Sequence, residues 1–219
     1  MICKSYQASL PTCSVLIKHL PEQAEIYVAH NTWHEYIAMS YRVLKKYNLP
    51  YRLLSGSEER VAAETATMSS YAGTIFSLDD FVTLSSGLVT TETTLFIYDS
   101  SLFEASQPRG QVFEPARVMA ANRLARDGKE WTKMASRFNS GTYNNQWMVV
   151  DLSKVSGGRL DDGALWVMEQ LPGRQTKAFT QTLTQNHIQM RCIPKLLYQD
   201  MDRRSNVSAA SFGLLGVLQ

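Results

Sequence analysis

The sequence predicts an α+β fold built on antiparallel strands, and three stretches carry that prediction. Residues 14–20 and 25–30 alternate buried-type and polar side chains around the turn-forming segment LPEQ, which predicts a β-hairpin. A second hairpin is predicted over 144–155 and 163–171, joined by the glycine-rich segment SGGRLDDG. Between the two hairpins, residues 114–138 carry an apolar face at helical spacing.

Two helical stretches are predicted in more detail. In residues 114–138, Pro115 suits a first-turn position and Gly128 interrupts the pattern before it resumes. A further helix is predicted over residues 33–48, where apolar side chains recur at helical spacing until Pro50 ends the pattern.

The remaining segments show weaker patterns. Residues 55–70 are polar and predict a surface excursion, and residues 71–99 are rich in Thr, Val, Ile and Phe, which predicts two more strands. From about residue 173 the periodicity is lost. A short helix near residues 195–202 is the one element expected there, without continuation of the sheet.

Composition excludes several classes of protein. The 219 residues suit one domain of ordinary size. The 22 basic and 20 acidic residues are scattered and give a formal net charge of +2, so nucleic-acid binding is not expected. No run approaches the ~18 consecutive apolar residues that a transmembrane helix needs.

The cysteines leave one functional option. Cys3, Cys13 and Cys192 are odd in number and lack metal-ligand spacing, so we expect neither a disulfide framework nor a zinc site. A single functional thiol remains. The residues before Cys13 contain no apolar segment long enough for a signal peptide, so the sequence taken literally predicts a cytoplasmic protein.

Cys13 and His30 are the first candidates for chemistry. Cys13 opens the first strand of the predicted hairpin, and His30 lies near the end of the second, so the turn brings them within reach of each other. A neighbouring imidazole can help to populate a reactive thiolate. A buried structural cysteine beside a hydrogen-bonded histidine is the alternative on these residues alone.

Amide and carboxyl groups form the next candidates. Asn139, Asn144 and Asn145 precede a predicted strand, where they can donate hydrogen bonds to a developing oxyanion or simply form a turn. The adjacent acids of SLDDF, residues 77–81, are expected to cap a helix or lie in a solvated loop, since neighbours on a strand face opposite ways. The threonines of TTETT, residues 90–94, are explained by strand propensity.

Several ordered motifs resemble those of the phospholipase B-like family. They are TCSVLIKHLPE, AHNTWHEY, YAGTIFSLDDFVTLSSGLVTTETT, AANRLARDGKEWTKMASRFNSGTYNNQWMVVDLSKV and ALWVMEQLPG, which together span residues 12 to about 173. NSGTYNNQWMVVD is the most distinctive of them. The resemblance implies an amino-terminal-nucleophile hydrolase with a four-layer αββα sandwich of antiparallel sheets flanked by helices.

The resemblance also implies a cleavage site and a set of site residues. Self-cleavage is expected between Thr12 and Cys13, which would make Cys13 both the nucleophile and, through its new α-amino group, the carrier of the general base. His30 is expected to orient the thiol or the attacking water, and Trp33 to shape the acyl pocket. The oxyanion donor is expected to be Asn144 or Asn145, and Thr94 a polar wall residue of the substrate pocket. No metal or organic cofactor is implied.

The resemblance divides the chain into three parts. Residues 1–12 are expected to be a remnant of a pro-segment, 13–173 an incomplete phospholipase B-like domain, and 174–219 an unmatched, poorly ordered tail. Family members are longer, glycosylated, and lysosomal or secreted, whereas the one glycosylation sequon here, at Asn206, lies in that tail. We therefore expect a chain truncated at both ends, with parts of the family's chain as its partner.

Three functions follow as expectations. The first is removal of acyl chains from glycerophospholipids through a cysteine nucleophile exposed by autoproteolysis. The second keeps the fold and the nucleophile but cleaves an amide. The third is an inactive fragment without a catalytic role, because loss of strands would leave apolar faces uncovered.

Overall fold

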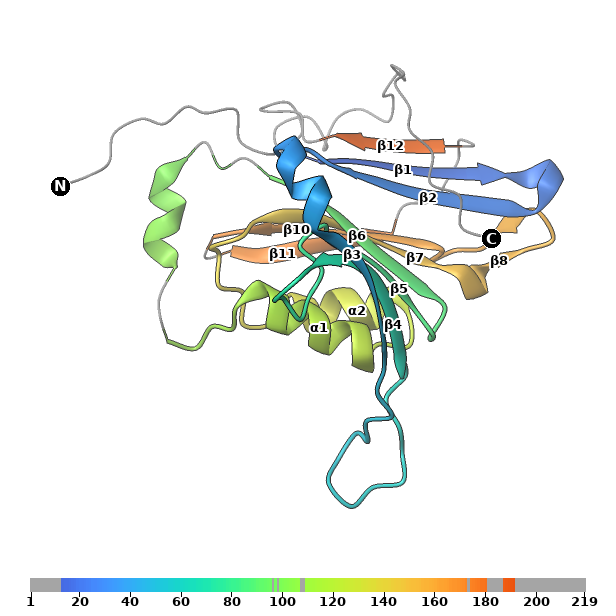
Figure 1. Ribbon diagram of the computed structural model, residues 1–219, viewed down its shortest axis with the longest axis horizontal. Helices are drawn as coiled ribbons and strands as arrows, with labels where there is room; N and C mark the ends of the chain where they lie inside the picture. Colours follow the sequence, from blue (N-terminus) through green and yellow to red (C-terminus); the bar gives the residue numbers. More distant parts are fainter. Residues whose placement is uncertain are drawn as a thin grey trace.

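Strands dominate the chain and form two stacked antiparallel sheets (Figure 1). The computed structural model describes residues 13–95, 97, 99–106, 109–172, 174–180 and 187–191, with backbone alone after residue 172. The predicted helix near 195–202 lies outside these residues. Among the described residues, no helix has the length and apolar character needed to cross a membrane.

The smaller sheet contains the predicted first hairpin. Its strands are β1 (Cys13–Leu20), β2 (Glu25–Thr32) and β12 (His187–Arg191), in the order β12-β1-β2. The turn between β1 and β2 includes a 3-10 helix, Pro21–Gln23, and ends at Ala24, which has a left-handed φ of 53°. The hairpin prediction is confirmed.

The larger sheet has seven strands, ordered β11-β10-β7-β6-β5-β4-β3. The strands are β3 (Arg42–Asn48), β4 (Thr65–Tyr71), β5 (Phe81–Leu84), β6 (Leu88–Thr94), β7 (Asn145–Asp151), β10 (Leu165–Leu171) and β11 (Arg174–Thr180). β7 and β10 form the predicted second hairpin, and a small ribbon of β8 (Val155–Ser156) and β9 (Arg159–Leu160) projects between them. β11 continues the sheet past residue 173, so the expectation that the sheet ends there is wrong; the strand forms by pairing with β10 and not from a local pattern.

Two helices cover the face of the larger sheet opposite to the smaller sheet (Figure 1). They are α1 (Glu114–Leu124), with Pro115 in its first turn, and α2 (Gly128–Ala135). Asp127 caps α2 by accepting a hydrogen bond from the Glu130 backbone N–H at 2.7 Å, which confirms the predicted interruption between the helices. Of the four expected layers, the described residues thus form one helical layer and two sheets.

The predicted helix over 33–48 is wrong. A 3-10 helix covers Tyr36–Tyr41, and Arg42–Asn48 form β3, the edge strand that pairs with β4. The pairing partner lies beyond a long loop later in the chain, so local spacing could not reveal it. The predicted excursion at 55–70 is also shorter than expected, because β4 begins at Thr65.

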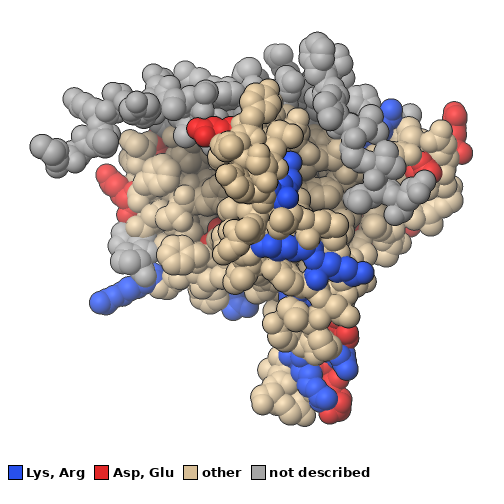
Figure 2. Space-filling model, in the orientation of Figure 1, with Lys and Arg blue, Asp and Glu red and all other residues tan. Residues whose placement is uncertain are grey.

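The loop between β3 and β4 projects away from the sheets (Figure 1) and carries acidic and basic side chains (Figure 2). Arg52 pairs with Glu58, and Arg126 reaches from the end of α1 to Glu59 at 3.0 Å. Exposed ion pairs of this kind contribute little to stability, so the fold depends mainly on its apolar layers.

Separate apolar cores fill the two interlayer spaces. Between the sheets lie the buried side chains of Val15, Ile17, Val28, Val89, Met148, Val150, Leu165 and Val167. Between the larger sheet and the helices, Trp131 of α2 contacts Trp147 of β7 with ring centroids 5.2 Å apart. Both indole N–H groups are satisfied: Trp131 donates to Asn122 Oδ1 at 2.7 Å and Trp147 to Gln170 Oε1 at 3.1 Å. β7 is buried along its entire length as a result.

The contact between Gly128 and Trp166 provides a test of this packing. A Cβ atom at Gly128 would lie 2.4 Å from Trp166 Cδ1, so Gly128→Ala should destabilise the fold by about 1–3 kcal/mol, although alanine is the better helix former. Urea unfolding measures the change. The exposed neighbour provides the control, since Lys129→Ala should shift stability by less than about 0.5 kcal/mol. A Gly128→Ala chain as stable as the parent would contradict this steric limit at the start of α2.

Candidate active site

Cys13 lies at the first position of β1, on the face of the hairpin that packs against the larger sheet. Cys13, Val15 and Ile17 are all buried, and their two-residue spacing puts them on one face of the strand. Only 7% of Cys13 is exposed. The nucleophile candidate therefore continues a row of apolar core residues.

The β1–β2 register brings His30 to this cysteine. Cys13 is paired with Thr32, and Val15 with His30. A ring nitrogen of His30, the Cys13 sulfur and a carboxylate oxygen of Glu92 all lie within 4.8 Å of one another. The two residues that the hairpin pattern predicted to approach each other do so, together with an acid from β6 that the sequence did not indicate.

Hydrogen bonds fix the ring of His30. Its Nε2 lies 3.2 Å from the backbone oxygen of Glu92, and since a carbonyl only accepts, Nε2 must carry the proton. Thr32 Oγ1 lies 3.4 Å from Nδ1 and donates its hydrogen to Asp79 Oδ1 at 2.9 Å. Burial lowers the pKa of His30 from 6.5 to about 4, so the ring is neutral at physiological pH.

The thiol of Cys13 is also neutral. Burial, followed by the negative charge of Glu92, raises its pKa from 9.0 to about 12, and the backbone N–H of Trp33 offsets only part of this increase. Cys13 follows Thr12 in the chain, so its own nitrogen is an amide and not a base. The thiol must therefore pass its proton to another group as it attacks a carbonyl.

Asp79 and Asp80 are both buried, so the prediction that they cap a helix or lie in a solvated loop is wrong. Asp79 forms an ion pair with Arg42, with Nε and Oδ2 3.0 Å apart, and accepts a hydrogen bond from Tyr71 at 2.8 Å. Asp80 has a left-handed φ of 51°, so the chain turns between the two acids and directs them to different partners. Adjacent residues on a regular strand could not share one site in this way.

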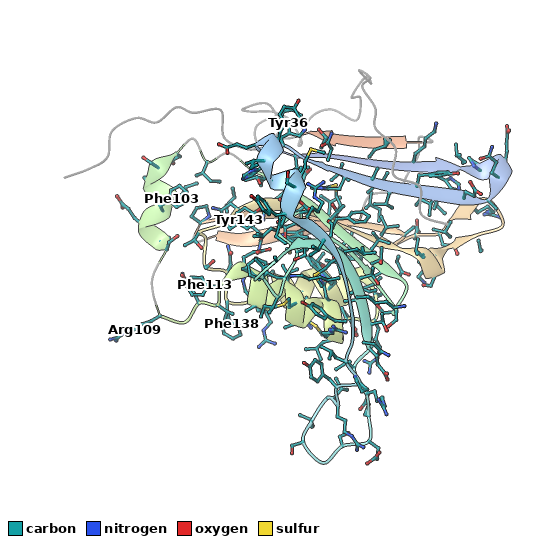
Figure 3. All side chains as sticks on the ribbon, in the orientation of Figure 1. Tyr36, Phe103, Arg109, Phe113, Phe138 and Tyr143 are labelled. Atoms are coloured by element: carbon teal, nitrogen blue, oxygen red, sulfur yellow. The ribbon has the colours of Figure 1, made fainter. Side chains whose placement is uncertain are left out.

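Asp80 and Glu92 form the acidic wall of the site. Tyr143 donates to Asp80 Oδ2 at 3.0 Å and lies 3.3 Å from Glu92 Oε1. Burial raises the pKa of Asp80 to about 7 and that of Glu92 well above its usual range, with Asp80 adding to the shift of Glu92. The carboxyls also hydrogen-bond to each other, an interaction that raises the pKa of Glu92 and lowers that of Asp80, so the two acids titrate as a pair. Figure 3 labels Tyr143 below the smaller sheet, with Tyr36 at the upper surface.

The asparagines predicted as donors divide into two groups. Asn139 and Asn144 hold the turn before β7: Asn139 Nδ2 donates to the Leu171 backbone oxygen at 2.9 Å, and Asn144 Nδ2 to that of Gly141 at 2.8 Å. Asn145 is the first residue of β7, is fully buried, and pairs with Thr94, the last residue of β6. Trp33 follows β2 and is 45% exposed.

The acids, together with Arg42, Tyr71 and Tyr143, are the part of the site that sequence reasoning missed. Glu92 was contained in the TTETT motif but was explained there by strand propensity. A charged residue within a strand whose other positions suit burial was the available signal, since buried carboxylates are rare unless they are paired or functional.

A family model described as Phospholipase B matches residues 3–198. The chain belongs to the phospholipase B family. This confirms the resemblance noted from the motifs and extends it beyond residue 173.

Curated relatives from animals and an amoeba support the same assignment. The chain is 49% identical over 165 residues to "Putative phospholipase B-like 2" from Bos taurus and from Homo sapiens, and 43% identical over 164 residues to phospholipase B-like protein C from Dictyostelium discoideum. Each comparison covers 74% of this chain and 28% of the relative. The chain thus spans little more than a quarter of the length of these relatives.

Solved structures share the fold at low sequence identity. A mutant of the conjugated bile acid hydrolase from Clostridium perfringens is 12% identical with a TM-score of 0.50, over 80% of this chain and 52% of that one. The Caenorhabditis elegans orthologue of N-acylethanolamine-hydrolyzing acid amidase is 7% identical with a TM-score of 0.52, over 81% and 69%. The predicted α+β, amino-terminal-nucleophile hydrolase-like fold is confirmed.

Glu114, at the start of α1, tests the electrostatics of the acidic wall. Burial and then the charge of Asp80 raise its pKa from 4.5 to about 9, so the folded chain holds a proton that the unfolded chain releases. Glu114 therefore favours folding least at high pH, and its contribution declines as pH rises from about 4.5 to 9. Glu114→Gln, which has no proton to lose, should gain stability over the parent as pH rises, on the order of 2 kcal/mol at about pH 8.

Thermal unfolding of both chains between about pH 5 and pH 8 measures the difference. Glu22→Gln, at an exposed carboxyl in the β1–β2 turn, serves as the control and should follow the parent. Parallel curves for Glu114→Gln and the parent would show that Glu114 titrates like a surface acid.

Proposed function

We propose that this chain carries the nucleophile of a phospholipase B-like hydrolase and cleaves itself between Thr12 and Cys13. The observation that supports the proposal most directly is the position of Cys13: a buried thiol at the first residue of β1, beside His30, in a chain of this family. Cleavage there would make Cys13 the first residue of the mature chain.

The geometry suggests why cleavage would activate the site. The Cys13 thiol attacks the carbonyl carbon of Thr12, the amide bond breaks as the nitrogen takes a proton, and water hydrolyses the resulting thioester. The products are a carboxylate on Thr12 and a free α-amino group on Cys13. Such an amine titrates near pH 7.7–8.0 in peptides, so it is a much stronger proton acceptor than the His30 ring, whose pKa burial lowers to about 4.

The mature thiol then attacks an acyl ester of a glycerophospholipid. The sulfur forms a thioester with the acyl group, the alcohol leaves with the proton held by the amine, and water releases the fatty acid. Trp33 places its backbone N–H at the sulfur and its partly exposed ring at the acyl chain. For the oxyanion donor we favour Asn145 over Asn144, because a residue within a sheet is held more firmly than one in a turn. Thr94, which pairs with Asn145, is our proposed polar wall residue of the substrate pocket.

The surface next to Cys13 suits a lipid substrate. Trp33 leads directly into the 3-10 helix Tyr36–Tyr41, where Tyr36, Ile37, Met39 and Tyr41 are 59–90% exposed. Figure 2 shows mostly uncharged atoms over this projection, with acidic atoms beside its top and basic atoms below it. In the sequence, Arg42, Lys45 and Lys46 follow the 3-10 helix, and Glu35 precedes it. Exposed aromatic and apolar side chains beside cations favour binding to an anionic lipid surface.

An amidase of the same fold is the second candidate. The same thiol and amine can cleave an acyl amide, and one structural neighbour is an orthologue of N-acylethanolamine-hydrolyzing acid amidase. Turnover of a fatty acyl ester compared with its amide isostere distinguishes the two candidates.

Intact mass of the purified chain tests the proposal at its first step. The parent should lose the mass of residues 1–12, Cys13→Ala should remain uncut, and hydrolysis by Cys13→Ala should fall at least about 1,000-fold because the nucleophile is gone. Cys3→Ala removes a thiol from the segment to be released and should still be cut. A parent that is folded by circular dichroism yet uncut would remove the enzyme assignment and leave an inactive fragment of the family.

The lipid-facing surface has its own test. Tyr36→Ser combined with Ile37→Ser should weaken binding to anionic phospholipid vesicles about 30-fold, since each side chain loses about 1 kcal/mol of apolar burial. Cosedimentation with vesicles measures it without reference to turnover. Tyr51→Ser with Leu54→Ser, which are 54% and 73% exposed on the projecting loop, is the matched control and should bind like the parent. Equal loss in both double variants would indicate non-specific adsorption.

A further inference from the structure

Three different metal-binding side chains meet at the nucleophile. Cys13 of β1, His30 of β2 and Glu92 of β6 offer a sulfur, an imidazole nitrogen and a carboxylate oxygen, all within 4.8 Å of one another. We propose that these residues bind Zn²⁺ and that the bound ion blocks the sulfur of Cys13; inhibition of hydrolysis would follow from the proposed function above. The site exists in the uncut chain, so it stands independently of the proposed autoproteolysis.

The donor set matches the preferences of zinc. Thiolate, imidazole and carboxylate are its usual protein ligands, at about 2.3 Å for sulfur and about 2.0–2.2 Å for nitrogen and oxygen. Tetrahedral ligands at those lengths lie roughly 3.3–3.7 Å apart. The three atoms are at most 4.8 Å apart, so an inward movement of about 1 Å or less by each side chain completes the arrangement.

The surroundings hold two of the ligands in place. The His30 ring is oriented by the hydrogen bond that Nε2 donates to the Glu92 backbone oxygen at 3.2 Å. Glu92 is held by Tyr143. Hydrogen bonds of this kind orient metal ligands and increase affinity.

Charge also favours a dication at this position. When the thiol and the Glu92 carboxyl release their protons, one thiolate and one carboxylate balance the two charges of Zn²⁺ and leave the buried set neutral. Asp79 already has its counter-ion in Arg42, with Nε and Oδ2 3.0 Å apart. A buried neutral set avoids the cost of an isolated charge.

The sequence could not indicate this site, because its ligands come from three strands and only one is a cysteine. Metal spacing motifs depend on ligands within one local segment. Here the sheet-on-sheet packing brings together residues that lie far apart in the chain, from Cys13 to Glu92.

Cobalt absorption tests the site directly. Co²⁺ replaces zinc and produces a thiolate-to-cobalt charge-transfer band when sulfur binds it. A full-length chain carrying Cys3→Ser and Cys192→Ser has Cys13 as its sole thiol, so any such band reports this residue. Titration should show one Co²⁺ per chain, with Zn²⁺ displacing it. His30→Gln and Glu92→Gln should each weaken Zn²⁺ binding about 100-fold, while the exposed His34→Gln should leave it unchanged.

Alkylation of the parent chain provides a second measurement that needs no variant at the site. Zn²⁺ should slow iodoacetamide labelling of Cys13 at least about 10-fold, as read by peptide mass, whereas Mg²⁺, which prefers oxygen ligands, should not. Absence of a charge-transfer band, unchanged affinity in folded His30→Gln and Glu92→Gln chains, or labelling unaffected by zinc would each overturn the proposal. An uncut chain that still binds zinc would refute only the autoproteolysis.

Discussion

Packing of the β1–β2 hairpin against the larger sheet is the constraint on which the candidate site depends. Val15, Ile17 and Val28 are almost fully buried against strands β6, β7 and β10, so the hairpin cannot shift by one residue without exposing this row. Cys13 is the next member of the same row. The register that buries the apolar side chains therefore also sets the thiol opposite Thr32 and within reach of His30. The same packing therefore stabilises the hairpin and positions the Cys13 thiol.

Burial has opposite effects on the acids and bases of the site. It lowers the pKa of His30 and raises those of Cys13, Glu92 and Asp80, so each group tends towards its neutral form. Asp79 differs from these groups in its partners: it forms an ion pair with Arg42 and accepts hydrogen bonds from Tyr71 and Thr32. Through Arg42 on one side and Thr32 on the other, Asp79 connects edge strand β3 to the hairpin. Because these groups tend to be uncharged, the α-amino group that the proposed cleavage would create on Cys13 is the base that the site otherwise lacks.

Local patterns in the sequence predicted those parts of the fold that depend on local interactions. Both hairpins and the helix interrupted near Gly128 follow from alternation, turn residues and caps within short windows. The error at residues 33–48 has the opposite origin, because β3 exists through its pairing with β4. The same division applies to the site. The approach of Cys13 and His30 follows from one hairpin, whereas Glu92, Asp80 and Tyr143 converge from separate strands and turns, and only the folded chain brings them together.

The two apolar cores show how much of the scaffold of the candidate site this chain forms by itself. It spans 28% of the length of its mammalian relatives, yet β7 is buried on both faces by residues of this chain alone: the hairpin covers one face, and α1 and α2 cover the other. The scaffold that positions Cys13, His30 and Glu92 is therefore internal to the described residues.

The bond before Cys13 belongs to the same chain, so the thiol and the carbonyl carbon that self-cleavage would join lie on adjacent residues. Hydrolysis of a lipid places a further demand on the exposed surface from Trp33 to Tyr41, where side chains lack the burial that fixes the core. A measurement of autoproteolysis therefore reports on the buried scaffold, whereas a measurement of lipid turnover reports also on the exposed surface around it.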